Sequence, residues 1–480
     1  MDAKKLTLMT DFYELTMANG YFKDNRKDEI AVFDVFFRRV PDGGGYAIFA
    51  GLEQVIEYIQ NLKFDQDEIN YLKSKNMFDE GFLKYLENFK FTCDVFAMKE
   101  GSAIFPNEPI LIVHGPMIEC QLIETMILLT INHQSLIATK ASRIVKEAKG
   151  RLVMEFGARR AHGGDAALYG ARAAYIGGVA GTSNTLADYK FGIPALGTMA
   201  HSYVQSFEDE YDAFKSYALN YPDNTVLLID TYDTLNDGLP NAIRVHNEIL
   251  KPMGKYLKGV RIDSGDLAYL TKKVREILDE NGLEETKITV SNSLDEYLIR
   301  DLVTVQEAKI DSFGVGERLI TARSEAVFGG VYKLTALKKG DKYLSKIKLS
   351  NNASKTTIPG FKQVYRFYDE ENKAIADVIT LHDEIINPNE PYLLFDPVYP
   401  WKQKLVTNFT IKKLLIPIFE KGKLVYDIPK LSEVKAYAQE ERATLWKEVL
   451  RLERPHQYYV DLSQPLWDLR EQLIATYRKK

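Results

Sequence analysis

The chain has 480 residues, of which 45% are hydrophobic and 27% charged, so it holds enough apolar side chain for a packed core and is not a disordered chain. A length of this order suggests two or three domains. The 62 basic and 67 acidic residues give a formal net charge of -5, which excludes the strong positive field of a duplex-binding protein. We therefore expect no nucleic-acid partner.

Neither a membrane-spanning segment nor a secretory leader is expected. The longest apolar run, Ile118–Ile131, is interrupted by polar residues and is too short to cross a bilayer. Residues 1–10 contain two lysines but no apolar stretch of signal-peptide type. Cys93 and Cys120 are the only cysteines, too few for a disulfide framework or a cysteine-based metal site. We expect a cytoplasmic protein with no membrane partner.

Residues 1–115 predict an N-terminal domain that mixes helices and strands. Apolar residues at helical spacing indicate helices at Gly51–Gln60 and Glu80–Glu87. Short β-favouring runs indicate strands at Ala31–Phe37 and Cys93–Met98.

Residues 116–335 show seven short β-favouring runs, each followed by a helical pattern, which is typical of parallel strands with crossover helices. This rhythm fits a doubly wound sheet or an α/β barrel. We favour the barrel, because small or polar residues follow each run and would converge at one rim, where barrels bind substrates. The runs are Leu152–Phe156, Tyr175–Val179, Ala195–Met199, Thr225–Ile229, Gly259–Ile262, Lys287–Val290 and Ser312–Val315.

Residues 336–480 form the third predicted segment. Alternating apolar and polar residues across turn signals predict an antiparallel sheet within Val331–Thr380. The end of the chain, Leu431–Arg478, has helical spacing. The two β-containing flanks are candidates to pack together as one discontinuous domain.

The run Gly259–Asp266 is the most suggestive motif, because a predicted strand delivers an arginine and an aspartate to its end. Arg261 is suited to bidentate anion binding, and Asp263 to binding sugar hydroxyls or a metal ion. Helix capping by Ser264 or Asp266 explains the same run without any function. The motif alone leaves both interpretations open.

Two neighbouring loops indicate an anion site. Gly314 and Gly316 follow the last predicted strand, and glycines let backbone N–H groups approach a phosphate. Ser291, Asn292 and Ser293 follow the preceding strand and add small hydrogen-bond donors. A tight turn explains the glycines equally well.

His201 stands where a predicted strand meets a helix, a position suited to a general base, a metal ligand or a phosphate acceptor. Asp230 ends the next strand and is placed to hold one ring nitrogen. For a single histidine, helix capping or a core position is the commoner explanation. No second histidine lies at metal-ligand spacing, so we expect no zinc site.

The run Glu155–Arg160 ends the first predicted strand with an aromatic ring and two guanidinium groups. Phe156 is suited to stacking on a flat ring, and Arg159 or Arg160 to pairing with a carboxylate or phosphate. A core phenylalanine beside surface arginines is the better explanation of this run taken alone.

Together these residues resemble the nicotinate phosphoribosyltransferase family. The matching motifs follow the family's order over most of the chain, and the ordered set is far more specific than any one motif. They are residues 10–17, 36–39, 155–160, 181–183, 197–202, 230–233, 260–266, 313–316 and 359–362.

The resemblance implies a type II phosphoribosyltransferase fold, an irregular seven-stranded α/β barrel with a mixed α/β second domain. It implies that nicotinate and phosphoribosyl pyrophosphate yield nicotinate mononucleotide and pyrophosphate, for NAD biosynthesis. It further implies Mg²⁺ as a cofactor and ATP as a co-substrate, whose hydrolysis is coupled through a phosphorylated His201. A homodimer with shared active sites is also implied, with contacts to substrate and partner from residues 1–115.

Roles for single residues follow from the resemblance. Phe156 would stack on the pyridine ring, and Tyr13 of the partner subunit would cover its other face. Asp230 or Asp263 would orient the imidazole of His201. The remaining candidates are Arg159 and Arg261 near the ring, Ser291, Asn292, Ser293, Gly314 and Gly316 at the 5′-phosphate, and Arg38, with Arg39 as the alternative, at the pyrophosphate across the dimer.

Ser183 bears on the choice of substrate. The related nicotinamide enzyme has an aspartate here, which accepts from an amide but repels a carboxylate, whereas a serine donates to a carboxylate. A phosphoribosyltransferase for nicotinamide or quinolinate is the alternative enzyme. A catalytically inactive scaffold is the alternative of another class, and the presence of His201 and Asp263 disfavours it. Glu317–Arg318 departs from the family's pattern and leaves a phosphate contact by Arg318 open.

Overall fold

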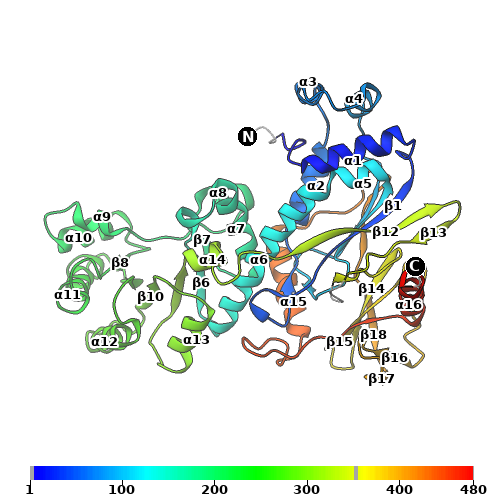
Figure 1. Cartoon of the computed structure of the whole chain (residues 1–480). Helices are drawn as coiled ribbons and strands as arrows, with labels where there is room; N and C mark the ends of the chain where they lie inside the picture. The colour runs from blue at the N-terminus through cyan, green and yellow to red at the C-terminus, as the bar shows by residue number, and fades with distance from the viewer. Residues whose placement is uncertain (1–4, 351–354, 479–480) are drawn as a thin grey trace. The chain divides into compact units, whose positions relative to one another are not determined.

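The chain divides into two compact units in the computed structural model, which describes residues 5–350 and 355–478 (Figure 1). The central unit comprises residues 137–326, and the flanking unit comprises residues 1–136 and 327–480. The first boundary falls inside the long helix α6 (Glu124–Glu147). In the part of the chain that is described, no helix combines the length and the apolar character needed to span a membrane.

The central unit is built on a six-stranded sheet in the order β7-β6-β11-β10-β9-β8. Every neighbouring pair in it is parallel, so the carboxyl ends of all six strands lie at the same edge. Helices on a parallel sheet cover its faces, which is why a strand such as β11 is buried along its whole length. The strands are β6 (Leu152–Glu155), β7 (Gly181–Thr182), β8 (Val226–Leu228), β9 (Gly259–Ile262), β10 (Lys287–Ser291) and β11 (Ser312–Val315).

One of the seven predicted strands is wrong. Residues 175–177 continue the helix α7 (Gly164–Gly177), and β7 begins only at Gly181. Gly177 lets this helix pack closely, since a Cβ there would lie 2.5 Å from the carbonyl oxygen of Ala138. Gly178, at φ +118°, then ends the helix. Helical packing therefore outweighs the β preference of Tyr175 and Ile176.

The predicted strand Ala195–Met199 forms only one parallel bridge, between Thr182 of β7 and Ala195. The sheet thus has six strands and a seventh segment attached by a single bridge, and it does not show a closed barrel. The other five runs lie where the sequence predicts them, and they establish a mixed α/β fold around a parallel sheet.

Helices follow the strands of the central unit as crossover connections. Figure 1 shows α10, α11 and α12 side by side next to β8 and β10. Several helices begin at an Asn or Asp whose side chain accepts from the first turn, which ends each loop sharply. The elements are η2 (Ala158–Arg160), α8 (Thr185–Phe191), α9 (His201–Gln205), α10 (Glu210–Asn220), η3 (Thr234–Gly238), α11 (Leu239–Val245), η4 (His246–Leu250), α12 (Leu267–Glu280), α13 (Glu296–Thr304) and α14 (Glu317–Ile320).

The flanking unit joins segments from both ends of the chain. Its larger sheet has the order β13-β12-β1-β5-β3-β19-β20, and the interior strand β1 pairs antiparallel with β12, about 300 residues later. The predicted strands and helices of residues 1–115 lie where expected. The elements are α1 (Phe12–Lys23), β1 (Ile30–Phe37), η1 (Pro41–Gly43), β2 (Ala47–Ile48), α2 (Leu52–Asn61), α3 (Gln66–Ser74), α4 (Glu80–Glu87), β3 (Asp94–Ala97), β4 (Ala103–Ile104), β5 (Leu111–Pro116), α5 (Met117–Leu122), β12 (Gly330–Lys339), β13 (Lys342–Ser345), β19 (Ile416–Glu420) and β20 (Lys423–Leu424).

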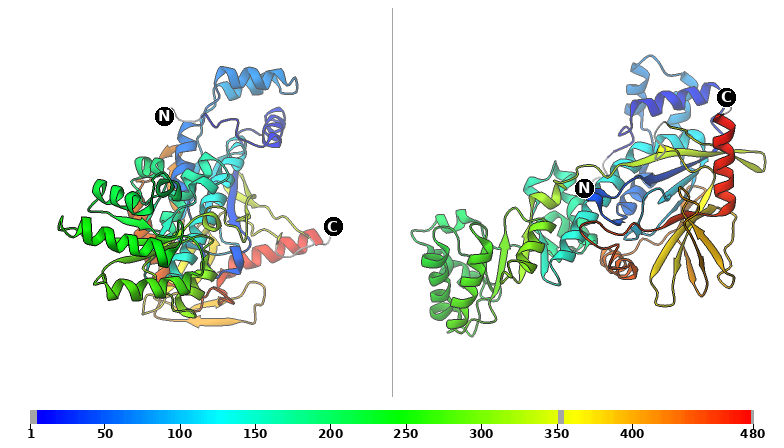
Figure 2. Two further views of the ribbon diagram at one scale, coloured as in Figure 1. Left: turned by 90° about the vertical axis from the view of Figure 1, so that its left-hand side faces the viewer. Right: turned by 60° about the horizontal axis from the view of Figure 1, so that its bottom comes forward.

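A second, four-stranded sheet of the flanking unit has the order β18-β14-β15-β21. The segment predicted as one antiparallel sheet therefore splits between two sheets, and its residues 351–354 lie outside the described residues. The predicted C-terminal helix is two helices, because β21 pairs with β15 between them; α16 packs beside β15 and is the red helix in Figure 2. The elements are β14 (Lys362–Tyr368), β15 (Ala374–Leu381), β16 (Tyr392–Phe395), β17 (Gln403–Val406), β18 (Thr410–Lys413), α15 (Leu431–Thr444), β21 (Val460–Leu462) and α16 (Gln464–Arg478).

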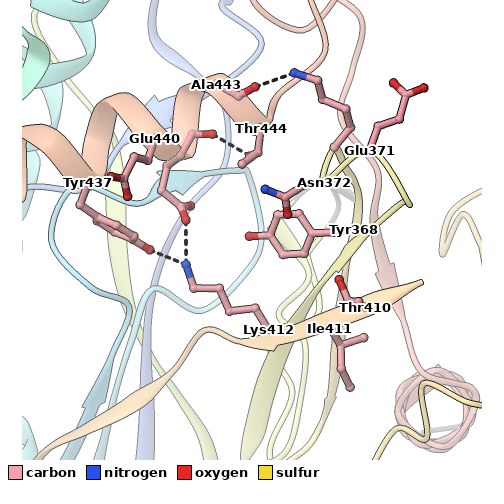
Figure 3. Close-up of a pocket in the computed structure, with 12 residues that line it drawn as sticks. Tyr368, Glu371, Asn372, Thr410, Ile411, Lys412, Tyr437, Glu440, Ala443 and Thr444 are labelled. Carbon is pink, nitrogen blue, oxygen red and sulfur yellow. Dashed lines mark hydrogen bonds and ion pairs between the residues drawn. The ribbon is translucent and has the colours of Figure 1, made fainter. Parts of the chain in front are cut away.

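A surface pocket of about 600 Å³ lies between α15 and the strands β14 and β18, wholly within the flanking unit (Figure 3). Both of its lysines are already engaged. Lys412 donates to the Tyr437 hydroxyl and to Glu441, each at 2.8 Å, and Lys373 donates to the carbonyl of Ala443 at 2.6 Å. The pocket contains none of the candidate site residues.

Candidate active site at the carboxyl edge of the parallel sheet

Residues from the segment before α9, from the loop after β9 and from the end of β10 converge on one arginine of the central unit. Arg261 donates from Nε to Ser291 Oγ at 2.9 Å and from Nη2 to Asp263 Oδ1 at 3.1 Å. Its Nη1 donates to Thr198 Oγ1 at 3.2 Å, and Ser291 in turn donates its hydroxyl to Asp263. Since a guanidinium has five N–H donors, two remain for a ligand.

His201, the first residue of α9, stands between two carboxylates and a hydroxyl. Its Nδ1 lies 3.2 Å from Thr231 Oγ1. Its Nε2 lies 3.9 Å from both Asp230 Oδ1 and Asp263 Oδ2. The His201 side chain is 39% exposed, whereas that of Asp230 is 2% exposed. The imidazole is therefore partly exposed to solvent, and the Asp230 side chain is buried beside it.

Asp230 ties the loop after β9 to the loop after β8. Its Oδ2 accepts from the Asp263 backbone N–H at 2.8 Å and from the Ser264 hydroxyl at 2.6 Å. Its Oδ1 is buried and has no hydrogen-bond partner among the described residues. Burying a carboxylate oxygen without a hydrogen bond costs free energy. A cation bound at Asp230 Oδ1 would offset that cost.

Phe156 forms an aromatic wall next to this network. The Arg261 guanidinium carbon lies 5.6 Å from the centroid of its ring. A Cβ on Gly314 would stand 2.5 Å from the ring, and one on Gly316 would stand 3.1 Å from the Phe156 carbonyl oxygen. The two glycines of the motif therefore leave room for Phe156, a packing reason for glycine at both positions.

Glu155, at the end of β6, is fully buried beneath this wall. Its carboxylate accepts from the Gly157 backbone N–H and from Thr182 Oγ1, the latter at 2.6 Å. Burial raises the pKa of the Glu155 carboxyl, and the hydrogen bonds from Thr182 and Gly157 oppose that rise.

Some of the predicted site residues make no hydrogen bond to the residues around Arg261 and His201. Arg159 and Ser183 are exposed, and among the described residues no hydrogen bond or ion pair engages either side chain. Asn292 and Ser293 are exposed at φ +87° and +52°, in a left-handed turn immediately after β10. They follow Ser291 directly, but within the described part of the chain their side chains bond only to each other.

Two residues whose roles the sequence left open make local contacts. The Asp266 carboxylate accepts from the Tyr269 backbone N–H at 3.0 Å, so Asp266 is the cap of α12. Arg318 donates from Nη1 to Asp295, the cap of α13. That bond turns Arg318 toward a carboxylate of this chain.

Tyr13 and Arg38 belong to the flanking unit. Tyr13, on α1, has 46% of its surface exposed. Burial of its hydroxyl end, followed by the charges of Glu124 and Glu14, raises the pKa of Tyr13 to about 12. The Arg38 guanidinium lies over the ring of Phe36 at 5.6 Å, and its Nε finds no partner among the described residues.

Sequence reasoning missed four residues that hold the site together. Thr198 and Thr231 bond to Arg261 and His201, and Glu155 bonds to Thr182. All four lie in or beside the motifs noted above, but a hydroxyl or carboxylate in a loop has many local uses. Only the folded arrangement identifies their partners.

Within residues 5–350 and 355–478, no three or more His, Cys, Asp or Glu side chains form a group that could hold a metal ion. A metal at this site would therefore need ligands from a bound substrate in addition to Asp230 and Asp263.

Comparison with known proteins places the whole chain in one group. Residues 8–132 match the nicotinate phosphoribosyltransferase N-terminal domain, residues 152–372 the nicotinate phosphoribosyltransferase family, and residues 361–470 its C-terminal domain. The chain is 46% identical over 476 residues to nicotinate phosphoribosyltransferase of Bacillus subtilis, which covers 99% of this chain and 96% of that protein.

Solved structures show the same likeness. The crystal structure of human nicotinic acid phosphoribosyltransferase matches with a TM-score of 0.86 at 30% identity, covering 97% of this chain and 99% of that one. Nicotinate-nucleotide pyrophosphorylase from Pyrococcus furiosus matches with a TM-score of 0.69 at 25% identity, covering 92% and 97%. The likeness extends over both units.

Proposed function

The chain belongs to the nicotinate phosphoribosyltransferase family, and we propose that it joins nicotinate to phosphoribosyl pyrophosphate, forming nicotinate mononucleotide and pyrophosphate for NAD biosynthesis. The observation that carries this proposal is the meeting of His201, Asp263 and Arg261 at one edge of the parallel sheet. Ligands of α/β folds bind at that edge, outside the carboxyl ends of the strands.

The transfer of the phosphoribosyl group to nicotinate requires positioned substrates and stabilised charges, and it requires no proton transfer. The pyridine nitrogen lone pair forms the new bond to ribose C1, and the C1–oxygen bond breaks with its electron pair leaving on pyrophosphate. No proton moves, so no general base is needed. Charge develops on the ribose ring and on the leaving group, and preorganised charges at the site stabilise both.

The ring-binding part of the site is proposed to centre on Phe156. Its face would stack on the pyridine ring, and the two unused N–H donors of Arg261, with the unpaired guanidinium of Arg159, would attract the substrate carboxylate. Ser183 has an exposed hydroxyl able to donate to that carboxylate. Tyr13 of the partner subunit would cover the second face in a homodimer.

The phosphate groups are proposed to lie along the loops after β10 and β11. Ser291, Asn292, Ser293, Gly314 and Gly316 would hold the 5′-phosphate through backbone N–H groups, and the left-handed turn at Asn292 and Ser293 supports this because such turns form anion-binding concavities. Arg38, or Arg39, from the partner would reach the pyrophosphate.

A Mg²⁺ ion fits the carboxylates that are present. Such ions are held by one or two carboxylates together with substrate phosphates, and Asp230 offers a buried, unpaired Oδ1 beside Asp263. When bound there, Mg²⁺ supplies neutralisation of the charge on the leaving pyrophosphate.

His201 is proposed to carry the coupling to ATP. The two carboxylates near Nε2 favour a proton on that nitrogen, which leaves the lone pair on Nδ1 beside Thr231. That lone pair would attack the γ-phosphorus of ATP, and ADP would leave with the electrons of the broken P–O bond. Water would later release phosphate from the ring.

A closed seven-stranded barrel belongs to the same proposal. The segment beginning at Ala195 is attached to β7, at one edge of the sheet, and leads to His201. His201 contacts Thr231, which follows β8 at the opposite edge. This contact supports a sheet that curves back on itself. The cytoplasmic location stays a prediction.

The reaction is tested by incubating the purified protein with phosphoribosyl pyrophosphate and one of nicotinate, nicotinamide or quinolinate. The product is identified by mass spectrometry. We expect nicotinate mononucleotide from nicotinate alone. Equal use of nicotinamide would overturn the role of Ser183, and no product from nicotinate would overturn the function.

Coupling is tested with γ-labelled ATP. We expect an acid-labile phosphoryl group on His201 and its loss in His201→Ala, which retains weak synthesis without ATP. Equal loss of the ATP-dependent and ATP-independent rates would contradict the phosphohistidine role.

A further inference from the structure

Glu155 joins two loops that the proposed reaction uses for different purposes. Glu155 of β6 and Thr182 of β7 face each other in the register of the parallel pair, so their side chains lie on the same side of the sheet. Phe156 and Gly157 follow Glu155 directly, and Ser183 follows Thr182. The end of β6 thus leads to the aromatic wall, and the end of β7 to the residue beside the substrate carboxylate.

Three hydrogen bonds from one buried residue hold these loops together. The Glu155 carboxylate accepts from Gly157 N–H and from Thr182 Oγ1, and the Glu155 carbonyl accepts from Ser183 N–H at 2.9 Å. Thr182 Oγ1 accepts in turn from the Asn184 backbone N–H at 3.0 Å. The chain of bonds therefore runs from the Phe156 loop to the start of α8.

The arrangement is tightly built. A Cβ on Gly157 would lie 2.8 Å from Glu155 Oε1 and 2.6 Å from Ile320, so a glycine is required where the loop passes over the carboxylate. Both donors to the carboxylate point at separate oxygens, and only a group that accepts at two positions satisfies both. A glutamine keeps an oxygen for the Gly157 N–H, but its amide nitrogen can only donate to Thr182 Oγ1, so the Thr182 hydroxyl must accept there and the negative charge of the acceptor is lost.

We propose that Glu155 is a positioning residue for the acid substrate, which through Thr182 sets the placement of Ser183 relative to the ring of Phe156. This inference rests on the proposed function, because it names the residue that shapes the nicotinate end of that site. Glu155 itself touches no substrate. Its removal should therefore weaken nicotinate binding while leaving the phosphoribosyl end of the site in place.

The test compares Glu155→Gln and the milder Thr182→Val with the wild-type enzyme. We expect the KM for nicotinate to rise about tenfold or more in both, since a charge-assisted hydrogen bond corresponds to roughly a tenfold or larger effect on binding. The KM for phosphoribosyl pyrophosphate and the kcat at saturating nicotinate should change less than about threefold. Thr182→Ser keeps the hydroxyl and should recover most of the lost affinity.

Thr286→Val is the matched control. Thr286 is as fully buried as Thr182, and its hydroxyl donates to the Leu257 carbonyl at 2.9 Å, but it precedes β10 and lies at the amino edge of the same sheet. It should lower thermal stability without changing either KM. If Thr182→Val and Thr286→Val change the nicotinate KM equally, Glu155 is only structural and the inference is overturned. The same conclusion follows if Glu155→Gln lowers kcat while both KM values stay unchanged. A wild-type enzyme that makes no nicotinate mononucleotide would instead overturn the proposed function.

Discussion

Each unit of the molecule contains an arginine paired with a carboxylate, and the two clusters differ in how far their charged side chains are exposed. In the flanking unit, Arg366 is fully buried and pairs with Asp377 through two nitrogens, at 2.8 and 2.7 Å. Its remaining nitrogen bonds to Glu441, and Nη2 also bonds to the carbonyl of Ala103. In the central unit, Arg261 is 15% exposed and its neighbour Asp263 is 29% exposed.

The difference separates a structural cluster from a functional one. Around Arg366, the carboxylates of Asp377 and Glu441 are both paired with the guanidinium, so the cluster holds β14, β15 and α15 together. Near Arg261, Asp230 Oδ1 has no hydrogen-bond partner among the described residues, and His201 Nε2 lies 3.9 Å from both Asp230 and Asp263. Polar groups left incomplete beside solvent are what a ligand can complete.

The largest effect expected is on stability, from Arg366→Met. This variant leaves Asp377 as a buried, uncompensated charge and leaves Glu441 paired with Lys412 alone, and we expect it to lower the free energy of unfolding by about 3–5 kcal/mol, measured by urea denaturation. Arg451→Met removes an exposed pair with Glu448 and should cost less than about 1 kcal/mol. Equal losses in the two variants would remove the distinction between the clusters.

Asp263→Ala should lower the activity strongly and the stability little, the opposite of Arg366→Met. It removes a carboxylate beside His201 and Arg261, and we expect kcat/KM for phosphoribosyl pyrophosphate to fall about 100-fold or more, in line with the loss of a preorganised charge. The urea midpoint should change little. Asp279→Ala, on the surface of α12, is the control and should change neither quantity. Unchanged kinetics in Asp263→Ala would place the site elsewhere.

The smallest effect expected concerns Glu14, which is buried like the Arg366 cluster but is bonded by hydroxyls alone. Thr125 donates to it at 2.6 Å, and Thr10 donates to its other oxygen. Burial raises the pKa of Glu14 to about 7 from an ordinary value of 4.5. Between pH 4.5 and about 7 the folded chain therefore binds more protons than the unfolded chain. The free energy of unfolding falls as the pH rises through this range.

The non-titrating variant Glu14→Gln should remove that fall. Between pH 6 and 7 the wild-type chain should lose about 1 kcal/mol more stability than the variant, measured by urea denaturation at each pH. Glu57→Gln, at an exposed position on α2, should keep the wild-type dependence. The same slope in all three chains would show that Glu14 stays ionised when folded.

The strands of the central unit show how far sequence pattern reaches. Gly259–Ile262 and Ser312–Val315 are strands with the predicted bounds, because short apolar runs between turn residues and helical patterns have few other uses in an α/β fold. Tyr175–Val179 fails because a β-favouring run directly after a helical pattern is continued as helix when a glycine allows close packing. The Ala195–Met199 run makes one bridge only.

By itself the sequence determined the residue types of the site, their order and their place at the ends of strands, since these are local properties of the chain. It could not determine that Thr198 and Thr231 bond to Arg261 and His201, that Arg318 turns to Asp295, or that Glu155 joins two loops. Those pairings are made between segments up to 63 residues apart. A hydrogen bond has a range of about 3 Å, so its partner is chosen only when packing brings the two segments together.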